Sequence, residues 1–135
     1  LCHNVHPLAN VTPVNIALSN APGVLRLSEN GSMSTVTESG AVGVRAIRLD
    51  DFVADGNPPP GIVKIDIEGY GAQCLAGMQR IIERHRPVLF IEVHNWEEEK
   101  AATALPGYAT EALDTVRRFP YCIRVVPDRA KLRTE

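Results

Sequence analysis

Two apolar segments separated by an amphipathic one constrain the fold more than any other feature of the sequence. VKIDI at residues 63–67 and VLFIEVH at residues 88–94 have the composition of buried strands. The residues between them repeat apolar side chains at the spacing of a helix of about four turns. The central apolar positions of this helix are Leu75, Met78 and Ile82. Pro87 ends the helix, because a proline disfavours helical backbone at the residue before it. The pattern predicts a right-handed βαβ unit with parallel strands.

The flanking sequence extends the same alternation of strands and helices. We expect further strands at residues 12–18, 24–27, 42–52 and 122–126, and a second helix that begins at Thr110, a good N-cap residue. The stretch 29–43 is rich in small polar residues and predicts a hairpin or loop. The sum predicts one α/β domain over residues 1–135, with helices on both faces of a mainly parallel, Rossmann-like sheet in three layers.

Composition excludes several classes of protein. The net charge is −2 and the basic residues are scattered, so neither a nucleic-acid nor a membrane partner is expected. An apolar run of about 20 residues, which a membrane-spanning helix needs, is absent from the sequence, and we expect a cytoplasmic protein. The three cysteines, Cys2, Cys74 and Cys122, form no CxxC pair, which argues against a disulfide framework and a zinc site.

Acidic side chains lie where the two strands of the βαβ unit end. Side chains alternate along a strand, so Asp66 and Glu68 share one face with Lys64, and Glu92 shares a face with His94. If the strands are parallel neighbours, the four candidates Asp66, Glu68, Glu92 and His94 meet at the carboxyl edge of the sheet. Ligands of open α/β sheets bind at that edge.

These residues also have structural interpretations, because strand ends are exposed and acids there are either simply solvated or cap the next helix. Glu68 precedes the predicted helix, where a negative charge interacts favourably with the helix dipole. His94 is either a general base or metal ligand or a hydrogen-bonded structural group. A structural role suits Asp66 less well, because it sits inside an apolar run and burial of an unpaired carboxylate is costly. Lys64, on the same face, either pairs with an acid or belongs to the lower rim of the sheet, and it receives no assigned role.

Gly77 lies in the interior of the predicted helix. A glycine there costs about 0.8–1 kcal/mol relative to alanine. Close packing of the helix on the sheet is the simplest reason to expect a glycine at this position.

Several motifs in order resemble a known enzyme family. VKIDIEG, CLAGM and RPVLFIEVHN, preceded by VNIALSNAPGVLRL and IRLDDF, are similar to the FkbM family of S-adenosylmethionine-dependent methyltransferases. The resemblance covers residues 4–95 approximately. It implies a class I methyltransferase fold, S-adenosylmethionine as the cofactor, and methyl transfer to an oxygen of a small molecule or glycan.

The resemblance also implies roles for particular residues. VNIALSN corresponds to the third strand of the family, whose end lies near the adenine, so Ala17, Leu18 and Ser19 become candidate cofactor contacts. Asp66 and Glu68 fall where the acceptor and the sulfonium meet. Asp66 would then orient or deprotonate the acceptor, with Glu68, Glu92 and His94 as alternates or helpers.

The sequence departs from the family at two places. Gly71 stands where the family usually has a second glutamate. The glycine-rich Asp-x-Gly-x-x-x-Gly turn and the acidic residue that binds the cofactor ribose are absent from the 135 residues. We therefore expect the chain to be the C-terminal two-thirds of a methyltransferase domain that lacks its N-terminal strands, and to bind cofactor weakly when alone.

Two other functions stay open at this point. The carboxylates and His94 are suitable ligands for Mg²⁺ or Mn²⁺, which would support phosphoester hydrolysis. The missing cofactor turn is also consistent with a non-catalytic or degenerate α/β module. The sequence does not indicate the methyl acceptor or the oligomeric state.

Overall fold

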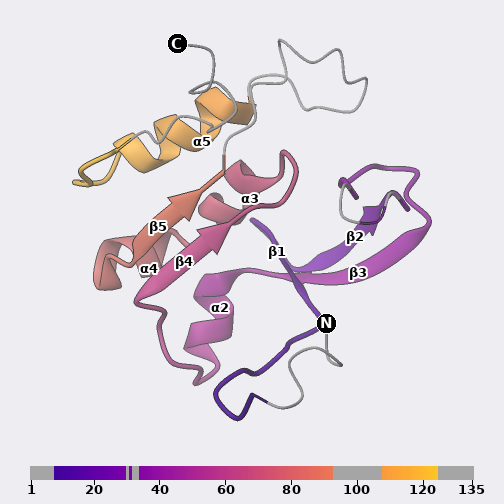
Figure 1. Cartoon of the computed structure of the whole chain (residues 1–135), viewed down its shortest axis with the longest axis horizontal. Helices are drawn as coiled ribbons and strands as arrows, with labels where there is room; N and C mark the ends of the chain where they lie inside the picture. Colours follow the sequence, from indigo (N-terminus) through magenta and orange to yellow (C-terminus); the bar gives the residue numbers. More distant parts are fainter. Residues whose placement is uncertain (1–7, 30, 32–33, 93–107, 125–135) are drawn as a thin grey trace.

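A computed structural model describes residues 8–29, 31, 34–92 and 108–124, with backbone only for 108–110 (Figure 1). Strands β1 (Ala17–Leu18), β3 (Val42–Ile47) and β2 (Gly23–Leu27) form one sheet in that order. Strands β4 (Ile62–Ile65) and β5 (Val88–Ile91) form a second sheet. The helices are α2 (Leu49–Ala54), α3 (Gly71–Ala76), α4 (Gln79–His85) and α5 (Tyr108–Arg117). The described chain is thus a mixed α/β structure with two small sheets.

The predicted βαβ unit is confirmed. β4 and β5 are parallel neighbours, with Ile62 opposite Val88 and Ile65 opposite Ile91. The chain between them forms α3 and α4. This register brings the carboxyl ends of both strands to the same edge of the sheet.

The helix predicted between these strands is broken into two. α3 ends at Ala76 and α4 begins at Gln79. At the break, the amide of Asp50 donates to the carbonyl of Gly77 (3.0 Å), and the Asp50 carboxylate accepts from the amides of Arg80 (3.2 Å) and Ile81 (3.0 Å). A residue from α2 therefore caps the start of α4, and the single long helix is replaced by two short ones.

Gly77 packs as closely as the sequence suggests, though against the end of a strand. A Cβ atom on Gly77 would lie 1.9 Å from the carbonyl oxygen of Ser19. Ser19 directly follows β1. Only glycine permits this approach of the helix break to the backbone of β1.

The other predicted elements are partly right. β2 matches its prediction, whereas β1 covers only two of the residues predicted as a strand. The strand predicted over 42–52 is too long, because β3 ends at Ile47 and the residues from Leu49 onward form α2. A helix is favoured there because Arg48 and Asp51 pair at i,i+3 spacing (2.6 Å) and acidic residues occupy the first turn. α5 begins two residues before Thr110. Residues 122–124 are irregular, not a strand, and 125–126 lie outside the described residues.

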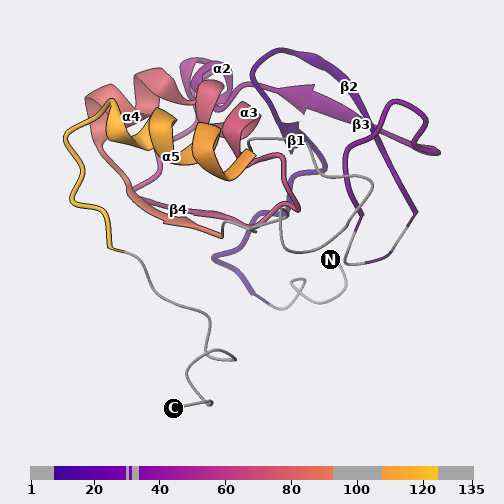
Figure 2. The same ribbon diagram turned by 90° about the horizontal axis from the view of Figure 1, so that it is seen from above.

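The core lies between the β4–β5 sheet and the helices on one of its faces (Figure 2). Leu75, Met78 and Ile82 are at most 1% exposed and form its centre. The opposite face of the sheet exposes Ile62, Val88 and Phe90, at 66%, 54% and 60% of their surface. Among the described residues, this sheet is therefore covered on one face, and the expected third layer is not seen there.

Whether a helix can cross a bilayer depends on its length and on how apolar it is. None of the helices within the described segments is both long and apolar enough to cross a bilayer.

Candidate functional site

The carboxyl ends of β4 and β5 bring two of the predicted acids together. Asp66 is the first residue after β4 and Glu92 the first after β5. The amide of Glu92 donates to the carbonyl of Ile65 (2.9 Å), which continues the ladder by one residue and holds the two acids at one edge. His94 lies outside the described residues, so its place at this edge stays a prediction.

Asp66 is paired, and it is not buried. Its side chain is 37% exposed and forms a salt bridge with Lys64. The expectation of a buried Asp66 is wrong, because the strand ends at Ile65 and the aspartate already lies at the open rim. The hydrogen bond to Asp66 raises the pKa of Lys64 above its ordinary value, and the charges of Asp66 and Glu92 act in the same direction. Lys64, to which the sequence assigned no role, thus orients the candidate carboxylate.

A tight turn carries Glu68 away from the strand direction. Glu68 and Gly69 both have positive φ angles, 41° and 86°. The amide of Tyr70 donates to the carbonyl of Ile67 (3.1 Å) and closes the turn. Glu68 therefore does not continue the alternation of β4. The N-cap residue of α3 is Tyr70, two positions later, and the first turn of α3 contains no acidic residue.

The end of β1 meets this turn. Ala17 and Leu18 are half-buried, and Ser19 is 3% exposed. The amide of Ser19 donates to the carbonyl of Ile47 (2.8 Å), and its hydroxyl lies 2.9 Å from the hydroxyl of Tyr70. The residues predicted to contact a cofactor and the turn that follows Asp66 are thus joined by one hydrogen bond between side chains 51 positions apart.

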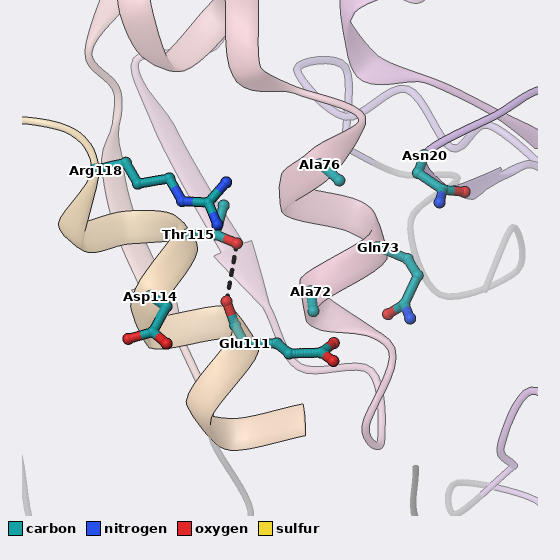
Figure 3. Close-up of a pocket in the computed structure, with 8 residues that line it drawn as sticks. All are labelled: Asn20, Ala72, Gln73, Ala76, Glu111, Asp114, Thr115 and Arg118. Atoms are coloured by element: carbon teal, nitrogen blue, oxygen red, sulfur yellow. Dashed lines mark hydrogen bonds between the residues drawn. The ribbon is translucent and has the colours of Figure 1, made fainter. Parts of the chain in front are cut away.

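A pocket of about 330 Å³ opens beside the end of β1, between α3 and α5 (Figure 3). It is lined by Asn20, Ala72, Gln73, Ala76, Glu111, Asp114, Thr115 and Arg118. The small side chains of Ala72 and Ala76 leave room over α3, while α5 contributes two acidic side chains and Arg118, the residue directly after α5, contributes a positive charge. Sequence reasoning did not identify this pocket, because it depends on how α3 and α5 pack and not on a local motif.

A metal site needs several ligating side chains close together. A group of three or more histidine, cysteine, aspartate or glutamate side chains able to hold a metal ion does not occur among them. The part of the chain that the structure describes thus gives no specific support to the hydrolase alternative.

Comparison with known proteins gives two matches. The profile of a family described as the methyltransferase FkbM domain matches residues 2–121. A protein of Haloferax volcanii named hexuronic acid methyltransferase AglP is 30% identical over 101 residues, which cover 70% of this chain and 41% of that protein. The chain therefore spans less than half the length of this curated relative. No solved structure matches the chain significantly.

Proposed function

Because the chain belongs to the methyltransferase FkbM domain family, we propose that it acts with S-adenosylmethionine and transfers a methyl group to a hydroxyl of a glycan or small molecule. The observation that carries the proposal is the meeting of β1 with the turn after β4, through Ser19 and Tyr70. Candidate cofactor residues and candidate acceptor residues come from different strands, and a transferase needs both at one place.

The residues at the end of β1 suit part of a cofactor site. Half-buried Ala17 and Leu18 offer apolar surface, and buried Ser19 hydrogen-bonds through its hydroxyl to Asn20, which lines the pocket. These three residues would hold the adenosine portion. When bound, S-adenosylmethionine supplies a methyl group on a positively charged sulfur.

Asp66 is the residue that we place closest to the acceptor. Its carboxylate is held by Lys64 at the rim of the sheet and is exposed enough to accept a hydrogen bond from a substrate hydroxyl. A methyltransferase that works by in-line displacement mainly has to orient the acceptor hydroxyl and remove its proton. Glu68, Glu92 and His94 are the candidates for helping Asp66.

We propose a sugar acid as the first acceptor to test, since the matched relative is named a hexuronic acid methyltransferase. A uronic acid offers several hydroxyls for methylation together with its carboxylate. The Asp66–Lys64 pair provides a hydrogen-bond acceptor and a neighbouring cation at the proposed acceptor position.

We further propose that these 135 residues form the C-terminal part of a larger methyltransferase domain. The exposed side chains of Ile62, Val88 and Phe90 form an apolar face that another layer would cover. The glycine-rich cofactor turn is also absent from the sequence. We expect the isolated chain to bind S-adenosylhomocysteine at least about tenfold more weakly than the full-length protein, by calorimetric titration. Equal affinities would contradict this division of the site.

Substitution of Asp66 tests the proposed role directly. In the full-length protein, Asp66→Asn should lower turnover with S-adenosylmethionine by about 10²–10⁴-fold, the range expected for a positioned acid or base. The melting temperature should stay near that of wild type, because Asp66 lies at the rim and outside the core. Asp55→Asn, at an exposed aspartate outside the site, is the matched control. Turnover of Asp66→Asn equal to that of the control would remove Asp66 from the mechanism.

A further inference from the structure

Tyr70 occupies the junction between the two halves of the proposed site. Its backbone closes the 66–70 turn through the hydrogen bond to Ile67, and it is the N-cap residue of α3. Its side chain reaches Ser19 at the end of β1. One residue therefore belongs to the turn that follows Asp66 and also contacts the strand end that carries the candidate cofactor contacts.

The direction of the hydrogen bonds around Ser19 follows from the number of available protons. The Ser19 hydroxyl donates to Oδ1 of Asn20 (3.3 Å), and a serine hydroxyl has a single proton. The Tyr70 hydroxyl must then donate to Oγ of Ser19. The result is a chain from Tyr70 to Ser19 to Asn20, which directs the carbonyl side of the Asn20 amide toward Ser19.

The hydrogen bond from Ser19 to Asn20 also affects which group faces a ligand in the pocket. Asn20 is exposed and lines the pocket between α3 and α5. With its oxygen engaged by Ser19, its amide nitrogen is the group left to donate to a ligand. Removal of the Tyr70 hydroxyl would leave the Ser19 hydroxyl held by Asn20 alone, and so less firmly oriented.

We propose that Tyr70 is a positioning residue of the methyltransferase. Its hydroxyl holds Ser19 and Asn20 in the orientation that receives the cofactor, and it ties that strand end to the turn after Asp66. This inference rests on the proposed function, and it adds a residue and a mechanism of coupling to it. Gly77 also packs against this strand end, since its main chain lies against the carbonyl of Ser19.

The test is a double-mutant cycle in the full-length protein, with S-adenosylhomocysteine as the titrant. We expect Tyr70→Phe and Ser19→Ala each to weaken its affinity by about 3–10-fold, the loss expected for one hydrogen bond. The double variant should be no weaker than the weaker single variant, because both substitutions break the same chain. Tyr70→Phe should also lower kcat, because the turn that follows Asp66 loses its side-chain attachment to Ser19.

Tyr121→Phe is the matched control. The Tyr121 hydroxyl donates to the carbonyl of Pro87 (2.8 Å), at the opposite end of β5 from Glu92. Both variants remove one tyrosine hydroxyl, so both should lower the melting temperature, whereas Tyr121→Phe should leave the affinity and kcat as in wild type.

Each outcome of this cycle decides the question. A non-additive loss of affinity confined to Tyr70→Phe and Ser19→Ala supports the proposal. Wild-type affinity in Tyr70→Phe, or fully additive losses in the double variant, would overturn it and leave the proposed function intact. Failure of the wild-type full-length protein to bind S-adenosylhomocysteine would overturn the proposed function, and the role of Tyr70 with it.

Discussion

Replacement of Gly77 by alanine tests how tightly the helix break is packed against β1. The added Cβ would lie 1.9 Å from the carbonyl oxygen and 2.8 Å from the carbonyl carbon of Ser19, and real Cβ contacts are essentially never shorter than 3.0 Å. The strand end or the helix break must therefore move by about 1 Å. Because the obstacle is backbone and not a flexible side chain, we expect a cost near the upper end of the ~1–3 kcal/mol typical of overpacking.

A smaller effect opposes this cost. Gly77 has a φ of −82° and a ψ of 0°, which alanine adopts without strain. Gly→Ala at such a position stabilises by about 0.4–1 kcal/mol through the unfolded state. The net loss is therefore about 2 kcal/mol, or about 6–10 °C in the melting temperature of a chain of this size.

The assay is thermal unfolding followed by circular dichroism, with Gly61→Ala as the matched control. Gly61 has no heavy atom within 4 Å of its would-be Cβ, so alanine there should change the melting temperature little. Gly77→Ala should also weaken S-adenosylhomocysteine binding to the full-length protein, since Ser19 is displaced. A melting temperature for Gly77→Ala at or above that of Gly61→Ala would refute the reasoning.

Two further predictions concern stability. Asp50→Ala leaves the amides of Arg80 and Ile81 without their acceptor, and it should cost about 2–3 kcal/mol in chemical unfolding, whereas the exposed Asp55→Ala should cost close to nothing. Burial raises the pKa of the Cys74 thiol from 9.0 to about 11, so the folded state retains that proton longer than the unfolded state. Stability should be unaffected by this group below pH 9 and fall by about 2–3 kcal/mol between pH 9 and pH 11. Denaturant unfolding across that range should show this component in wild type and not in Cys74→Ala; equal slopes would contradict it.

The βαβ unit was predictable because its signals are local. Apolar periodicity, the proline before β5 and the length of the helical segment all lie within one stretch of sequence. The break between α3 and α4 was not predictable in this way. It depends on a carboxylate 31 positions away from Ile81, and on the approach of Ser19 to Gly77, so tertiary contacts override the helical pattern.

For the candidate site too, features with local signals were predictable, and features that depend on tertiary contacts were not. The meeting of Asp66 and Glu92 followed from parallel pairing of their strands, which the sequence indicates. Pairing of Lys64 with an acid on the same face was one of two alternatives left open from the sequence, and the structure shows that Asp66 is its partner. Tyr70 was missed, because nothing in the local sequence tells that its hydroxyl meets Ser19 across 51 positions.

The most direct test of the account is transfer of a labelled methyl group. The full-length protein would be incubated with S-adenosylmethionine carrying an isotopically labelled methyl, together with a glycan that contains hexuronic acid. We predict a labelled methyl ether on the sugar and stoichiometric S-adenosylhomocysteine, with both products lost in Asp66→Asn and retained in Asp55→Asn. Label transfer that is undiminished by Asp66→Asn, or cofactor that stays unconsumed with every small-molecule and glycan acceptor tried, would contradict the account.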